Sequence, residues 1–169
     1  MRVNYFRPVL NSSNGRTDVI IEKAINYTPE KVFDSPDKIN IFCRDVLQLH
    51  KNPEEHAYIF CFDTGKHLIG IYEIAHGANN VVNIAYASVF AKALLVNAAG
   101  IIFVHNHPGM NVGPSQDDCE LIERLWKIGA FVGVTLIDAI IIEGIYGINY
   151  YSFLEHGDFI DYKEIDIYA

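Results

Sequence analysis

An apolar segment that ends in two alternating histidines constrains this chain more than any other stretch. Residues 100–104 (GIIFV) have the composition of a buried strand and run directly into residues 105–108 (HNHP). Side chains two positions apart on a strand point to one face, so His105 and His107 are expected to converge. Asp118 follows at the expected start of the next helix. Two imidazoles and a carboxylate from adjoining elements predict a metal site.

The predicted ligands fit zinc, because three protein ligands of this kind leave the fourth position of a tetrahedral ion for water. A second explanation exists for part of the pattern. Ser115 and Asp118 match the SxxD capping box that begins many helices. The two histidines favour a metal site over a simple cap, because a cap requires nothing of the loop before it.

Composition and charge narrow the class of protein. The 169 residues suit one globular domain, since half of them are apolar. The formal charge is -8 and Lys and Arg form no basic run, so nucleic acid is not expected as a direct partner. Three cysteines without CxxC spacing indicate a reducing cytoplasm, and no apolar run approaches the roughly 18 residues of a membrane span. The sequence leaves an oligomer open.

The order of the expected elements predicts an α/β sandwich with a mixed sheet in a single domain. The expected boundaries are a flexible N-terminal arm over 1–17, the folded domain over 18–157 and an acidic tail over 158–169. Periodicity and turn residues predict a strand at 19–27, a helix from Pro36, a hairpin of 57–62 with 68–75, a helix at 89–97 and the strand into His105. They further predict a helix at 116–128 that stops at Gly129, a strand at 131–142 and a short strand at 149–154. Cys119 is expected to face inward from the helix at 116–128.

The motifs together resemble the JAB/MPN+ (JAMM) metalloprotein fold and, within it, the bacterial RadC-like proteins. The resemblance covers about residues 36–155 and combines EIAHG at 73–77, HNHP at 105–108 and PSQDD at 114–118. It implies a cytidine-deaminase-like mixed sheet between helices, with zinc held by His105, His107 and Asp118. It further implies that Glu73 accepts a proton from the activated water and that Ser115 helps to stabilise the oxyanion.

The resemblance thus implies a zinc-dependent metallohydrolase that uses a metal-activated water and cleaves an amide or isopeptide bond in a peptide-type substrate. Alternation along its strand leaves a second explanation for Glu73, an outward-facing carboxylate in solvent. The alternative function is a RadC-type DNA-repair-associated or protein-interaction module without hydrolytic activity. A zinc deaminase on the related fold is excluded, because the chain has neither HxE nor PCxxC. Asp138, in an apolar strand, is expected to hold either a group around the metal or a structural hydrogen-bond network.

Overall fold

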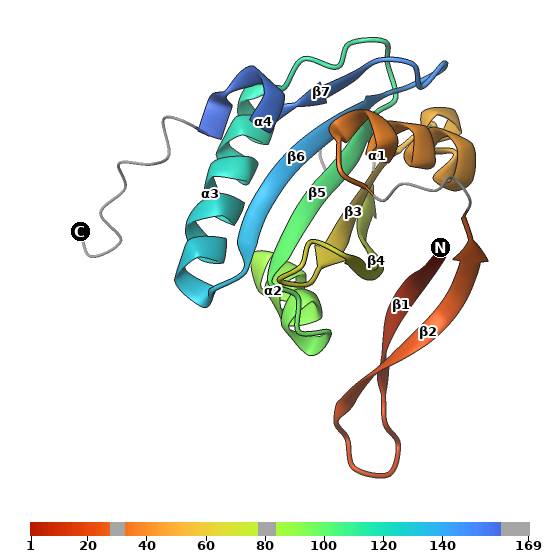
Figure 1. The fold of residues 1–169 in the computed structure, drawn as a ribbon, viewed down its shortest axis with the longest axis vertical. Helices are drawn as coiled ribbons and strands as arrows, with labels where there is room; N and C mark the ends of the chain where they lie inside the picture. Colours follow the sequence, from red (N-terminus) through yellow and green to blue (C-terminus); the bar gives the residue numbers. More distant parts are fainter. Residues whose placement is uncertain (28–32, 78–83, 160–169) are drawn as a thin grey trace.

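A seven-stranded mixed sheet forms the centre of the protein, with helices on both of its faces (Figure 1). The structure is a computed structural model and describes residues 1–27, 33–77 and 84–159. The strands are β1 (Arg2–Leu10), β2 (Thr17–Asn26), β3 (Glu55–Phe62), β4 (Leu68–Gly77), β5 (Gly100–His107), β6 (Thr135–Glu143) and β7 (Tyr150–Ser152), in the order β2-β1-β4-β3-β5-β6-β7. The predicted single-domain α/β class is confirmed.

Alternation along β3 divides the core between the two faces of the sheet. Ala57, Ile59 and Cys61 belong to one apolar cluster, which α2 (Tyr86–Leu95) and α3 (Gln116–Val132) cover. Phe60 and Phe62 point the other way, into a cluster that α1 (Pro36–Phe42) covers. A π-helical turn (Cys43–Leu47) and a 3-10 turn (Leu49–Lys51) extend α1, and the short α4 (Phe153–His156) follows β7. β5 is therefore buried on both faces, as its unbroken apolar sequence predicts.

The prediction of an irregular arm over residues 1–17 is wrong. β1 pairs antiparallel with β2 and contacts β4 in parallel, with Tyr5 opposite Ile71. The polar run after β1 is the turn of this hairpin, in which Asn11 donates a hydrogen bond from Nδ2 to Asp18. β2 agrees with the strand predicted at 19–27, whereas β1 was missed because no clear alternation of buried and exposed residues marks it. The predicted acidic tail lies almost wholly outside the described residues.

The long helix α3 also differs from the prediction at its end. It passes through Gly129 and ends at Val132, and Gly133, which follows it, has a left-handed φ of 77°. Gly129 is needed for close packing instead, because a Cβ there would lie 2.5 Å from the carbonyl oxygen of Val134. Cys119 is exposed rather than turned into the core. Among the described helices, none combines the length and apolarity that crossing a membrane requires.

Candidate metal centre

The end of β5 and the start of α3 bring the three predicted ligands together. β5 lies between β3 and β6, and His105 stands opposite Ala57 of β3. The chain then turns through Pro108 and returns to begin α3 at Gln116. Each of His105, His107 and Asp118 offers one ligand atom, and these atoms all lie within 4.8 Å of one another. The predicted convergence is confirmed.

The ligand atoms face one another at short range. The Nε2 atoms of His105 and His107 are 3.2 Å apart. Asp118 places Oδ1 3.0 Å from Nε2 of His105 and Oδ2 3.3 Å from Nε2 of His107. The three side chains are only 5%, 17% and 13% exposed, respectively. A tight, largely buried group of two imidazoles and a carboxylate suits a borderline divalent cation.

The neighbours of the imidazoles test how well the site fits zinc. Nδ1 of His107 donates a hydrogen bond of 3.1 Å to the carbonyl oxygen of Asn111. In the neutral ring the proton is then on Nδ1, which leaves the lone pair of Nε2 directed at the cluster. The ring of His105 packs against that of Phe103, with centroids 5.7 Å apart. Two imidazole nitrogens and one carboxylate are ligands that suit zinc, so the site fits a zinc ion held by His105, His107 and Asp118.

Ser115 and Asp118 form a complete capping box, so the second explanation of this pair is also correct. The backbone N–H of Asp118 donates to Oγ of Ser115 over 3.1 Å. In return, Oδ2 of Asp118 accepts from the hydroxyl of Ser115 over 2.6 Å and from its backbone N–H over 2.7 Å. The hydroxyl proton is thus committed to Asp118. Ser115 orients a predicted ligand, and its predicted oxyanion role would require this bond to break.

Electrostatics couple the carboxylate to the imidazoles. Burial alone would raise the pKa of Asp118, but hydrogen bonds with His105 and His107 outweigh it and hold this pKa far below the usual range. Burial likewise disfavours the charged form of His107, yet its hydrogen bond with Asp118 leaves a net raised pKa. A proton therefore occupies the cluster readily, and a cation must displace it.

Glu73 does not join this cluster. Regular alternation would place it on the same face as Ala75, which pairs with Ala57 and therefore lies on the His105 face. A bulge shifts the register, so that Glu73 stands opposite Tyr58 and takes the opposite face. Its carboxylate lies 2.9 Å from Nδ1 of His56 instead. The predicted position of Glu73 at the metal is therefore wrong.

A different carboxylate, Glu55, occupies the place expected for Glu73. It lies two positions before Ala57 on β3, so its side chain takes the face of His105. Burial raises the pKa of Glu55, while the nearby His105 and His107 lower it and Asp118 raises it further, with a net increase. The sequence reasoning missed Glu55. The signal available was its position at the start of a strand whose alternating residues face the core.

Asn106, between the two histidines, fixes the main chain on both sides of Glu55. Its side chain is buried; Oδ1 accepts from the backbone N–H of His56 over 2.8 Å, and Nδ2 donates to the carbonyl oxygen of Glu54 over 3.1 Å. Both polar ends of the amide are thus used. Asn106 therefore holds β3, which carries Glu55, next to β5, which carries the two histidines.

Replacing Asn106 by Ala is expected to lower the free energy of unfolding by about 1–3 kcal/mol, because two part-buried main-chain groups lose their partners. Amide hydrogen exchange at His56 is expected to accelerate, since its N–H loses its acceptor. Denaturant unfolding and exchange measured by NMR check both effects. An unchanged exchange rate at His56 would contradict this account of Asn106.

Two further buried carboxylates lie near β5 but serve other elements. Asp138 accepts hydrogen bonds from the hydroxyl of Ser152 over 2.7 Å and from the backbone N–H of Leu154 over 3.0 Å, so it joins β6 to β7 and α4. Glu143 pairs in register with His107. Its side chain accepts hydrogen bonds from Ile148 and Asn149 in the loop before β7. Asp138 therefore holds a structural network, which decides between the two expectations for it.

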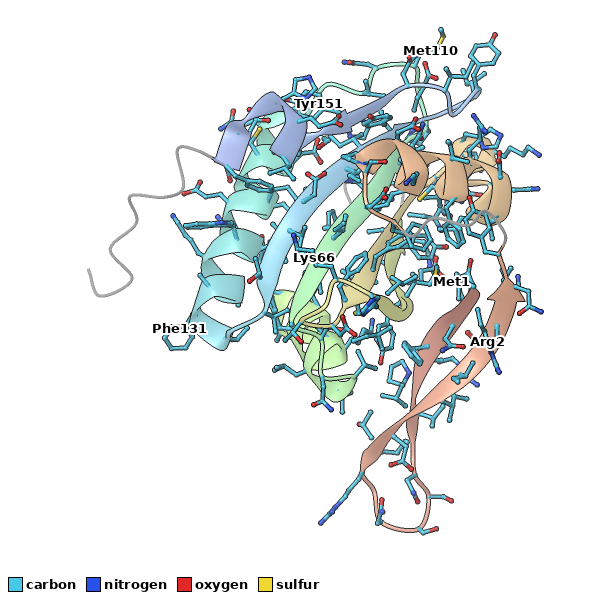
Figure 2. All side chains as sticks on the ribbon, viewed as in Figure 1. Met1, Arg2, Lys66, Met110, Phe131 and Tyr151 are labelled. Atoms are coloured by element: carbon cyan, nitrogen blue, oxygen red, sulfur yellow. The ribbon has the colours of Figure 1, made fainter. Side chains whose placement is uncertain are left out.

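The loop that follows the histidines packs against the β6–β7 connection. The backbone N–H of Gly144 donates to the carbonyl oxygen of Gly109 over 3.0 Å. A Cβ at Gly144 would lie only 2.2 Å from the carbonyl oxygen of Pro108, so the two segments touch through their main chains. Figure 2 labels Met110 at this end of the molecule, near the connection between β6 and β7. The loop that follows the histidines is thus held against the β6–β7 connection through main-chain contacts.

The fold and the site together define a class of protein: an α/β domain with a candidate catalytic-type metal centre at the end of a central strand. The sequence profile of the RadC-like JAB domain matches residues 33–158. The chain therefore belongs to the RadC-like JAB domain family. The matched region begins after the β1–β2 hairpin and contains all three predicted ligands and Glu55.

Several relatives carry the name UPF0758 protein. The chain is 33% identical over 138 residues to one from Thermotoga maritima, which covers 82% of the chain and 59% of the relative. It is 35% identical over 100 residues to one from Clostridium acetobutylicum (59% and 44%) and 34% identical over 114 residues to one from Cupriavidus taiwanensis (66% and 48%). The matches thus span about half the length of these relatives.

Proposed function

We propose that this protein is a zinc-dependent hydrolase that cleaves an amide or isopeptide bond in a peptide-type substrate. The observation that carries the proposal is the convergence of His105, His107 and Asp118 beside the partly buried carboxylate of Glu55. When bound, zinc would act as a Lewis acid that activates a water molecule and polarises a carbonyl group.

The chain's own groups would divide the remaining work. His105, His107 and Asp118 would hold the cation, and the hydrogen bond to Asn111 sets the tautomer of His107. Glu55, in place of the predicted Glu73, would take the proton from the water and deliver it to the leaving amine. Its raised pKa brings it nearer to the range in which a carboxylate both accepts and returns a proton. Ser115 would hold Asp118 in place, and its oxyanion role stays a proposal.

The alternative, a DNA-repair-associated or protein-interaction module without hydrolytic activity, receives less support. Structural zinc sites have four protein ligands, whereas His105, His107 and Asp118 supply three, which favours a catalytic centre over a structural one. The charge of -8 opposes direct binding to a phosphate backbone. We also propose a reducing compartment, the cytoplasm, because Cys43, Cys61 and Cys119 are all free.

Zinc content is the first test of the proposal. The purified protein, desalted without chelator, is expected to retain zinc, whereas His107→Ala loses most of it because one of three ligands is gone. His67→Ala is a matched control, since His67 is an exposed histidine that bonds to Asp63. Elemental analysis measures the metal. Equal zinc in the protein and in His107→Ala would remove His107 from the site.

Hydrolysis is the second part of this test. Cleavage of any amide or isopeptide bond releases a new amine, so amine release from unfolded protein and from isopeptide-linked peptides follows the reaction without knowledge of the natural substrate. Zinc-loaded protein is expected to release amines, and His107→Ala is not. Zinc binding without amine release from either substrate class would favour the non-hydrolytic alternative.

A further inference from the structure

A second group of two imidazoles and a carboxylate lies on the opposite face of the sheet from the metal centre. Oε1 of Glu73 is 2.9 Å from Nδ1 of His56 and 3.7 Å from Nδ1 of His76. The two imidazole rings stack, with centroids 5.7 Å apart and planes 29° from parallel. This group is separate from the proposed hydrolytic site, which uses none of the three residues.

The strand pairing explains why these side chains meet. His56 on β3 and His76 on β4 stand directly opposite each other, so their Cβ atoms are held close on one face. The bulge that turns Glu73 away from the metal centre brings it onto this same face, beside Tyr58. Three potential ligands are thus supplied by two adjacent strands whose backbone fixes their spacing.

The surroundings leave the carboxylate directed at the imidazoles. Tyr58 stands opposite Glu73 in register, so its side chain lies beside the carboxylate on this face. Lys92 is the nearby cation, but its Nζ binds the main-chain oxygen of Glu73, at 3.3 Å, and not the carboxylate. The side chains of His56 and Glu73 are 22% and 44% exposed, and that of His76 is 69% exposed. The group is therefore open to ions in solution.

We propose that His56, Glu73 and His76 form a second, exposed site for a borderline divalent transition-metal ion such as Zn²⁺. Imidazole nitrogen and carboxylate oxygen are the ligands that such ions prefer, and water would complete the coordination. The ring of His76 must turn toward the other two ligands, and its exposure gives it room to do so. Because the ligands are exposed and one must move, this site binds zinc more weakly than the buried centre does.

Occupation of this site would fix the beginning of β3. His56 follows Glu55 directly, and its backbone N–H is already bound by Asn106. A cation shared with His76 would tie this point of β3 to β4 as well. The site is therefore expected to stabilise the fold when zinc is present, whether or not the protein is a hydrolase.

Metal stoichiometry tests the proposal directly. The full chain is dialysed to equilibrium against free zinc, without chelator, and bound metal is measured by elemental analysis. The protein is expected to bind two equivalents and His76→Ala one, while His107→Ala keeps one. His67→Ala, which changes an exposed histidine outside both groups, is expected to keep two. Unfolding midpoints of the metal-free variants check that each is folded.

Thermal unfolding supplies a second measurement. Zinc is expected to raise the unfolding midpoint of His107→Ala and to leave that of the double variant His76→Ala/His107→Ala unchanged. The proposal is overturned if His76→Ala binds as much zinc as the unchanged protein, or if the double variant keeps the stabilisation. If the buried centre does not bind zinc, the pattern is different: His107→Ala keeps the bound zinc of the unchanged protein, and His76→Ala loses it.

Discussion

Replacing Glu55 by Gln is expected to lower the rate of amide hydrolysis by a factor of about 10²–10⁴ while zinc stays bound. The amide of Gln keeps the size of the side chain but cannot accept a proton at ordinary pH. The three metal ligands are untouched, because Glu55 faces the cluster from β3 whereas the ligands belong to β5 and α3. Amine release and zinc content, measured on the same preparation, separate the two effects.

Glu73→Gln is the matched control for this experiment. Glu73 belongs to the neighbouring strand but contacts His56 on the opposite face, so the rate is expected to change little. A large loss of rate in Glu73→Gln with full rate in Glu55→Gln would restore the original assignment of the base and contradict the geometry. Loss of zinc in Glu55→Gln would instead make Glu55 a ligand.

Asp138 is expected to make the stability of the fold depend on pH. Burial raises its pKa to about 6, although hydrogen bonds from Ser152, Leu154 and Ala139 oppose the increase. In the unfolded chain the pKa is about 3.9, so the folded state binds the proton more tightly. The resulting stabilisation is full below about pH 4 and is lost as the pH rises through 6. It amounts to at most about 3 kcal/mol.

Asp138→Asn isolates this contribution, because the amide resembles the protonated carboxyl group and does not titrate. Denaturant unfolding of both proteins between pH 4 and 8, with a chelator present to exclude metal effects, gives two stability profiles. The difference between the two free energies of unfolding is expected to change by up to about 3 kcal/mol over this range. Asp138→Asn becomes more stable relative to the unchanged protein as the pH rises. Parallel profiles would show that Asp138 does not titrate in this range.

The features that the sequence predicts well are those with strong local signals. The apolar run before His105 is buried on both faces, and alternation alone brings His105 and His107 together. The SxxD pattern marks the start of α3, which returns Asp118 to the same point. Three ligands could therefore be predicted without any knowledge of the sheet order.

The features that escaped prediction depend on long-range pairing. Glu73 was assigned to the metal, but one extra residue in β4 reverses the face it occupies. No local property of residues 72–75 marks that bulge, because the register is set by β3. Glu55 was missed for the related reason that its role follows only from the pairing of β3 with β5. In the β1–β2 hairpin, β2 was predicted as a strand at 19–27, but β1, which lies within the expected irregular arm, was missed.

The carboxylate of Asp118 is shared between an imidazole cluster and the main chain at the beginning of α3. A cation that draws this carboxylate inward also changes the hydrogen bonds that the backbone N–H groups of Ser115 and Asp118 donate. The NMR signals of these two amides therefore form a built-in reporter of occupancy at the buried centre. Metal titrations can be followed there without a substrate, a chromophore or an attached label.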